Sequence, residues 1–175
     1  IHEIKKNIGY GYGIMSGVKI AKGEYIGWCH ADLQTEPKDI YDAYIQNYSE
    51  LSKKNVLIKG QRINRNIFDN IFTIGMSFFA SIIFAKIISD INAQPKLFAK
   101  SFLKHLDDFP YDFSLDLYLL VIAKIRKYKI INHKVILKKR IYGDAKGGGN
   151  LIGKLKLIKR TFIYMVKLRI KLWKL

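Results

Sequence analysis

Short apolar segments alternate with longer mixed segments along this chain. The short ones are rich in Val, Ile, Tyr and Trp, are bounded by Gly, Asn or Pro, and predict β-strands. The predicted strands are Tyr25–Cys29, Val56–Arg62 and Tyr128–Lys139, and Leu97–Leu106 is either strand or helix. Strands that alternate with helices indicate an α/β fold, and we expect its sheet to be mostly parallel, with flanking helices.

The longer segments have the apolar spacing of helices. The predicted helices are Ile14–Ala21, Pro37–Tyr48, Ile71–Ser89, Phe113–Lys127 and a final basic helix, Leu151–Leu175. The segment Ile71–Ser89 is almost wholly apolar and reaches membrane-spanning length, with Lys86 as its single charge. We expect a buried or interface-lying helix there, and a transmembrane span is the alternative.

The final helix is amphipathic. Its basic side carries Lys156, Arg160, Lys167, Lys171 and Lys174, and the other side carries Ile152, Leu155, Ile158, Phe162, Val166, Ile170 and Trp173. This pattern favours a helix that lies on an anionic membrane surface, with Trp173 at the interface. The alternative is a helix that packs its apolar side on its own domain.

Size and charge narrow the function classes. The chain has 175 residues, enough for one domain with a core, and its net charge is +17. That charge favours nucleic acid, anionic lipid or phosphate-bearing ligands, although a general bias toward Ile, Lys and Asn contributes to it. The single cysteine, Cys29, excludes an internal disulfide and indicates a reducing compartment.

The segment that follows the first predicted strand carries candidate chemistry. His30, Asp32 and Gln34 alternate, and on an extended backbone side chains two apart point the same way. The sequence therefore predicts a divalent-cation site at the end of this strand, with coordination positions left open for a diphosphate. Imidazole suits manganese better than magnesium. The alternative is that Asp, Thr and Pro only cap the next helix.

Several motifs occur in a fixed order along the chain. They are Ala21–Ile26 (Ala-Lys-Gly-Glu-Tyr-Ile), His30–Gln34 (His-Ala-Asp-Leu-Gln), Lys59–Arg62 (Lys-Gly-Gln-Arg), Asp90, Asp112–Asp116 and Arg140–Lys146 (Arg-Ile-Tyr-Gly-Asp-Ala-Lys). Together they resemble family 2 glycosyltransferases, above all the dolichyl-phosphate mannose synthase-like and bactoprenol glucosyltransferase-like members. The resemblance covers nearly the whole chain, and His30 stands where that family usually has a carboxylate.

The resemblance implies a partial nucleotide-diphospho-sugar transferase fold (GT-A, Rossmann-like). Residues 1–150 would form the transferase domain without its first βαβ unit, which holds the nucleotide base and ribose, and 151–175 would form a membrane-proximal helix. We therefore expect a fragment that shows no turnover alone. The implied reaction is metal-assisted, inverting transfer of a sugar from a nucleotide-diphosphate donor to a lipid-phosphate or saccharide acceptor, at the cytoplasmic face of the cell membrane.

The resemblance also implies roles for the metal and phosphate contacts. Asp32, with His30 and Gln34, would hold a divalent metal, Mn or Mg. The donor diphosphate would be bound by three basic residues, Arg62, Arg140 and Lys146. A solvated surface arginine and a flexible basic linker are the alternatives for these basic positions.

Two carboxylates are the candidate catalytic groups under the same resemblance. Asp90 and Asp116 could take the proton of a hydroxyl acceptor as general base, whereas a phosphate acceptor would need positioning only. Helix capping or turn formation is the alternative for each. Two alternatives concern the function of the whole chain. One is a nucleic-acid-binding module, although no zinc-finger spacing or aromatic RNA-binding signature supports it. The other is an inactive membrane-associated scaffold of the same fold.

Overall fold

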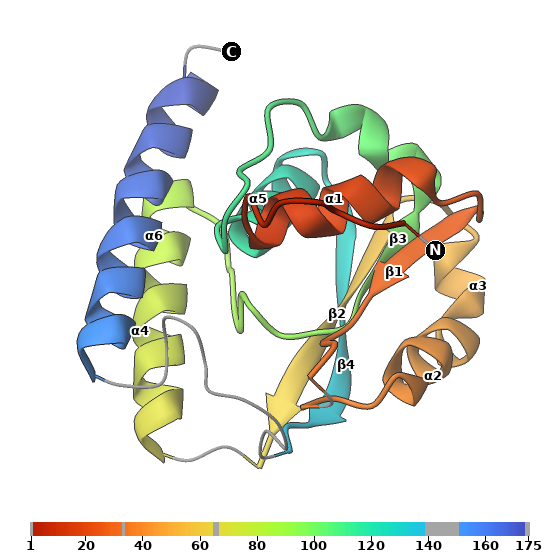
Figure 1. The fold of residues 1–175 in the computed structure, drawn as a ribbon, viewed down its shortest axis with the longest axis horizontal. Coiled ribbons are helices and arrows are strands. Elements are labelled where there is room, and N and C mark those ends of the chain that lie inside the picture. The colour runs from red at the N-terminus through yellow and green to blue at the C-terminus, as the bar shows by residue number, and fades with distance from the viewer. Residues whose placement is uncertain (1, 33, 65–66, 139–150, 174–175) are drawn as a thin grey trace.

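The computed structural model describes residues 2–32, 34–64, 67–138 and 151–173. Its centre is a four-stranded sheet in the order β1-β3-β2-β4 (Figure 1). The strands are β1 (Tyr25–Trp28), β2 (Val56–Ile63), β3 (Lys96–Ala99) and β4 (Lys129–Ile136). Strand β3 pairs antiparallel with both β1 and β2, and β2 pairs parallel with β4.

The α/β class with flanking helices is confirmed, and the sheet is mixed: β1, β2 and β4 run in one direction and β3 runs in the other. Only β3 opposes the other strands, yet it lies between β1 and β2, so two of the three pairings are antiparallel. The segment before β3 meets the sheet near the end of β2, where the Gly60 N–H donates to the Pro95 carbonyl over 2.7 Å. Strand β3 therefore starts at the edge where its neighbours end.

Helices flank this sheet. They are α1 (Tyr10–Ile20), α2 (Lys38–Gln46), α3 (Tyr48–Leu51), α4 (Ile67–Phe84), the 3-10 helix η1 (Lys100–His105), α5 (Leu115–Ile125) and α6 (Leu151–Trp173). Each predicted helix and strand has a counterpart at its predicted place. The ambiguous segment Leu97–Leu106 contains both kinds of element, because β3 runs directly into η1.

Apolar side chains of the sheet are buried on both faces. On β2, Leu57 belongs to the larger core, and its neighbours Val56 and Ile58 belong to the smaller one. The larger core is built around α5, whose residues 115–123 are all buried, together with α1 and the inner sides of α4 and α6. The smaller core lies under α2 and α3. The alternation of side chains along a strand explains this division.

Helices α4 and α6 lie side by side away from the sheet (Figure 1). Within the described residues, no helix combines the length and apolar character that crossing a membrane requires. Helix α6 buries Met165 and Leu168 in the larger core. Neither belongs to the apolar side described from the sequence, of which Leu155, Phe162, Val166, Ile170 and Trp173 are 40–80% exposed.

Candidate functional site

The strand directions bring most of the predicted site residues to one edge of the sheet. Strands β1, β2 and β4 run the same way and end at this edge, and β3 begins there. The segment His30–Gln34 follows β1, Arg62 lies near the end of β2, and Asp90 precedes β3. In open α/β sheets, ligands bind at the edge formed by the carboxyl ends of the strands.

The segment after β1 is a turn and not an extended strand. Strand β1 ends at Trp28, and the Gln34 N–H donates to the Asp32 carboxylate over 3.1 Å. Asp commonly closes such turns by accepting a backbone hydrogen bond two residues on. The prediction that His30, Asp32 and Gln34 are aligned by strand alternation is therefore wrong. The turn is also tied to the end of β4, because the Lys138 N–H donates to the Gln34 carbonyl over 2.8 Å.

His30 and Asp32 provide metal-binding chemistry within this turn. Burial lowers the pKa of His30, and Arg62 and Lys96 act in the same direction, while Asp32 and Asp116 oppose them. A neutral imidazole is the form that binds a metal. No group of three or more His, Cys, Asp and Glu side chains gathers for a metal within the described ranges. His30 and Asp32 are the His and Asp side chains of this turn that could hold a metal, and an imidazole in the set suits a transition-metal ion.

Arg62 and Asp90, predicted to act separately, form one ion pair. The Asp90 carboxylate accepts from the Arg62 backbone N–H and from its Nε, each over 2.8 Å, and from its Nη2. Each side chain is 13% exposed. Burial alone would raise the pKa of Asp90, but the hydrogen bonds and charge of Arg62 bring it below its ordinary value. Asp90 is therefore ionised at neutral pH and faces a guanidinium group.

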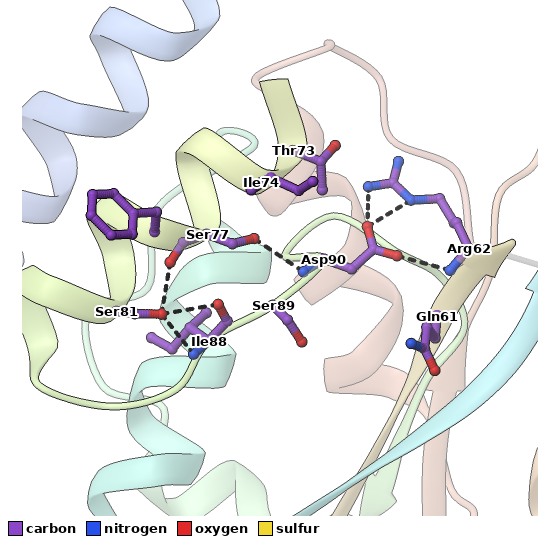
Figure 2. A pocket seen from close by; sticks show the side chains of 10 residues that line it. Gln61, Arg62, Thr73, Ile74, Ser77, Ser81, Ile88, Ser89 and Asp90 are labelled. Atoms are coloured by element: carbon purple, nitrogen blue, oxygen red, sulfur yellow. Dashed lines mark hydrogen bonds and ion pairs between the residues drawn. The ribbon is translucent and has the colours of Figure 1, made fainter. Parts of the chain in front are cut away.

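Two serines of α4 hold the segment that carries Asp90 (Figure 2). The Asp90 N–H donates to the Ser77 hydroxyl over 3.2 Å, and the Ile88 N–H donates to the Ser81 hydroxyl over 3.0 Å. Asp90 has a φ of 41°, in the left-handed region that Asp tolerates better than most residues. These serines had no predicted role, although their spacing of four places both on one side of α4.

A groove of about 400 Å³ lies between α4 and the Arg62–Asp90 pair. Gln61, Ser89 and the ion pair give it polar walls, and Ile74 lies on its α4 side (Figure 2). Phe78 also lines it and adds to the apolar wall. This volume falls within the range of small-molecule sites, and the mixture of apolar and polar groups is typical of them.

Asp116, the second predicted catalytic carboxylate, lies beneath the site. It is 1% exposed and pairs with Lys96 over 3.2 Å. Its carboxylate also accepts from the Tyr10 hydroxyl over 3.0 Å and from Gln94 Nε2 over 3.1 Å. A carboxylate enclosed in this way cannot meet an acceptor, so the geometry argues against Asp116 as the general base and assigns it a positioning role.

Lys96 connects this buried pair to the segment of Asp90. Its Nζ donates to the Ile91 carbonyl over 3.0 Å and to the Ala93 carbonyl over 2.6 Å. Its side chain is fully buried, and burial lowers its pKa while Asp116 opposes the shift. Lys96 had no predicted role. Its position directly before the apolar run Leu97–Ala99 was a signal that it could be buried with the strand. A buried lysine almost always has a partner, so a buried carboxylate could have been expected near it.

The remaining predicted phosphate contacts, Arg140 and Lys146, lie outside the described residues. Lys59, from the Lys59–Arg62 motif, is buried and donates to the Gly60 carbonyl over 3.2 Å. Burial, aided by Lys96, lowers the pKa of Lys59 to about 8. Three basic residues were predicted to bind phosphate, and Arg62 is the one that lies within the described residues. It is paired with Asp90.

Comparison with known proteins assigns the fold. No protein-family model matches the chain. Solved structures of glucosyl-3-phosphoglycerate synthase from Mycobacterium tuberculosis are similar to it. The complex with phosphoglyceric acid and the complex with Mn²⁺, UDP-glucose and phosphoglyceric acid each give a TM-score of 0.67 at 12% identity, over 95% of this chain and 56% of that chain. The UDP complex gives 0.66 at 13% identity, over 92% and 55%.

The chain thus spans about half the length of the solved structures that it matches. At this level of identity the likeness concerns the path of the backbone and not the side chains of the site. The chain has part of the nucleotide-diphospho-sugar transferase (GT-A) fold.

Proposed function

We propose that this chain belongs to an enzyme that transfers a sugar from a nucleotide-diphosphate donor to an acceptor with the help of a divalent metal. The observation that carries the proposal is the meeting of the His30–Gln34 turn and the Arg62–Asp90 pair at one edge of a GT-A sheet. The similar structures bind UDP-glucose, Mn²⁺ and phosphoglyceric acid, which supports this class of donor and metal. We also propose that the enzyme is a family 2 glycosyltransferase, and this part of the proposal rests on the ordered sequence motifs from Ala21–Ile26 to Arg140–Lys146.

Asp32 and His30 are proposed as the protein ligands of the metal, with the Gln34 side chain beside them. The bound metal supplies positive charge that stabilises the departing diphosphate. Arg62 adds a second positive group near Asp90, and we propose that Arg140 and Lys146 bind the donor diphosphate.

Asp90 is proposed as the general base, and the groove beside it as the acceptor site. The acceptor oxygen forms a bond to the anomeric carbon of the sugar while the bond from that carbon to the diphosphate breaks. Asp90 takes the acceptor proton, and the nucleoside diphosphate leaves. One base and one displacement invert the anomeric configuration. Ile74 and Phe78 line the groove, so an acceptor with a polar head and an apolar part, such as a lipid-linked one, fits it.

The variant Asp90→Asn tests this proposal. We expect its kcat for transfer to fall about 100-fold, because an amide cannot take the acceptor proton. Release of nucleoside diphosphate by the natural full-length protein is the measurement, with Mn²⁺ and a panel of nucleotide sugars and acceptors. Asp42→Asn is the control, since Asp42 pairs with Lys38 on the surface of α2. Equal turnover of the two variants would contradict the role of Asp90.

A further inference from the structure

A second, smaller pocket lies beside the acceptor groove. Its volume is about 100 Å³, and a cavity of roughly 10–15 Å³ already holds one water molecule. The pocket therefore has room for a group of several heavy atoms. It is formed where the β2–β4 pair, helix α5 and the segment before Asp90 meet, and its polar lining residues are Lys59, Ser89, Lys124 and Asn132.

The strand register directs Lys59 and Asn132 into this pocket from the sheet. The two residues are partners across the β2–β4 pair, as are Leu57 and Ile130 two positions earlier. Side chains two apart on a strand lie on the same face, and Leu57 is buried in the larger core, which is built around α5. Lys59 and Asn132 therefore lie on the face that α5 covers, where Lys124 of α5 also lines the pocket.

Lys59 is a buried cation without a carboxylate in contact among the described residues. It is 2% exposed, and in that part of the chain its Nζ makes a single hydrogen bond, to the Gly60 carbonyl. The charges that act on it, those of Lys96, Asp90 and Arg62, belong to the two ion pairs described above. With a pKa of about 8, Lys59 still carries its proton at neutral pH. A buried charge is costly unless it is paired, so this lysine favours an anion beside it.

The other polar groups of the pocket suit an anion as well. Lys124 is half-buried and adds a second positive charge. The Asn132 amide and the Ser89 hydroxyl can both donate hydrogen bonds. Within the described ranges, no Asp or Glu lines the pocket. The pocket thus combines two cations and two neutral donors without an acidic side chain, which is the composition of an oxyanion site.

We propose that this pocket binds a small oxyanion of the phosphate class, with Lys59 and Lys124 as its cations. The oxyanion supplies the charge partner that Lys59 lacks, and Asn132 and Ser89 donate hydrogen bonds to it. Ile88 and Ser89 also line the acceptor groove, so the oxyanion site adjoins the candidate active site. The proposal does not depend on sugar transfer, because it rests on the charges and size of this pocket alone.

Isothermal titration calorimetry of the natural full-length protein with inorganic phosphate tests the proposal. We expect Lys59→Met to weaken the binding of phosphate at least about tenfold, because it removes a charged hydrogen-bond donor. Lys129→Met is the matched control. Lys129 also lies on this pair of strands, but it precedes Ile130 and so lies on the opposite face, where it pairs with Glu50. This control should bind phosphate as the wild type does.

Thermal denaturation of the same samples separates a ligand-binding lysine from a structural one. Without phosphate, Lys59→Met should have a Tm at least equal to that of the wild type, because Met fills a similar volume and removes a buried charge. Phosphate should raise the Tm of the wild type and of Lys129→Met but leave that of Lys59→Met unchanged. If Lys59→Met does not fold, the half-buried Lys124→Met takes its place, with binding about threefold weaker than in the wild type.

Glycerol 3-phosphate distinguishes free phosphate from the phosphate group of a larger molecule. Lys59-dependent binding at least as tight as that of inorganic phosphate would assign the site to phosphate esters, and weaker binding would assign it to the free oxyanion; both results support the proposal. Unchanged phosphate affinity in Lys59→Met, or in Lys124→Met where it replaces that variant, would overturn it. So would a wild-type protein that binds neither compound.

Discussion

Replacement of Asp32 by Asn is expected to lower kcat for sugar transfer at least about 100-fold while the fold stays intact. The proposed metal depends on this carboxylate, and an amide is a weaker ligand without charge. The charge that develops on the leaving diphosphate would then lose its main stabilisation. The turn should survive, because an amide oxygen can still accept the hydrogen bond from the Gln34 N–H. Steady-state kinetics of the natural full-length protein at saturating Mn²⁺, with circular dichroism of the same sample, is the measurement.

Asp42→Asn serves as the control for this loss as well, because it removes a surface carboxylate of α2 that pairs with Lys38. The expected pattern is a folded, inactive Asp32 variant beside an active Asp42 variant. A folded Asp32→Asn protein with unchanged turnover would remove Asp32 from the mechanism, and the metal site proposed in this turn would go with it.

The second large effect is expected on stability. Lys96→Met should lower the free energy of unfolding by about 3–5 kcal/mol, because it leaves Asp116 buried without its cation. The carbonyls of Ile91 and Ala93 lose their donor at the same time. Urea denaturation measures this change, and a fall of roughly 10 °C in Tm should accompany it.

Two further variants separate the buried pair from a general effect of losing a lysine. Lys129→Met removes an exposed lysine that pairs with Glu50 and should cost less than about 1 kcal/mol. Lys96→Met/Asp116→Leu removes both buried charges and should regain part of the loss. If Lys96→Met cost no more than Lys129→Met, the buried pair would have no stabilising role of this kind.

The elements of the fold could be predicted from the sequence, because apolar periodicity reports burial directly. The run Tyr25–Cys29 predicted β1, and Phe113–Lys127 predicted α5. The direction of β3 could not be predicted in this way. The apolar pattern of a strand is the same in either direction. The segment that leads into β3 meets β2 through a contact between Gly60 and Pro95, which are far apart in the sequence.

The sequence was enough to predict which residues lie at the candidate site, but not how their side chains pair. The Asp90 and Arg62 motifs were found, but their pairing depends on how the segment before β3 folds against β2. The sequence marks Asp116 as a candidate base and places Lys96 beside an apolar run, but it does not pair the two. Only tertiary packing shows that they neutralise each other in the interior. For the His30–Gln34 segment, the assumption of an extended backbone failed because Asp32 accepts a hydrogen bond that closes a turn.

Paramagnetic broadening by Mn²⁺ tests the central claim most directly. In a ¹⁵N-labelled sample of this protein, we expect the strongest broadening at the backbone amides of the His30–Gln34 turn, and we expect Asp32→Asn to abolish it. The signals of exposed acidic residues far from the turn, such as Glu24, serve as internal controls. Broadening that is centred elsewhere, or that persists unchanged in Asp32→Asn, would contradict a metal-assisted transferase site at this edge of the sheet.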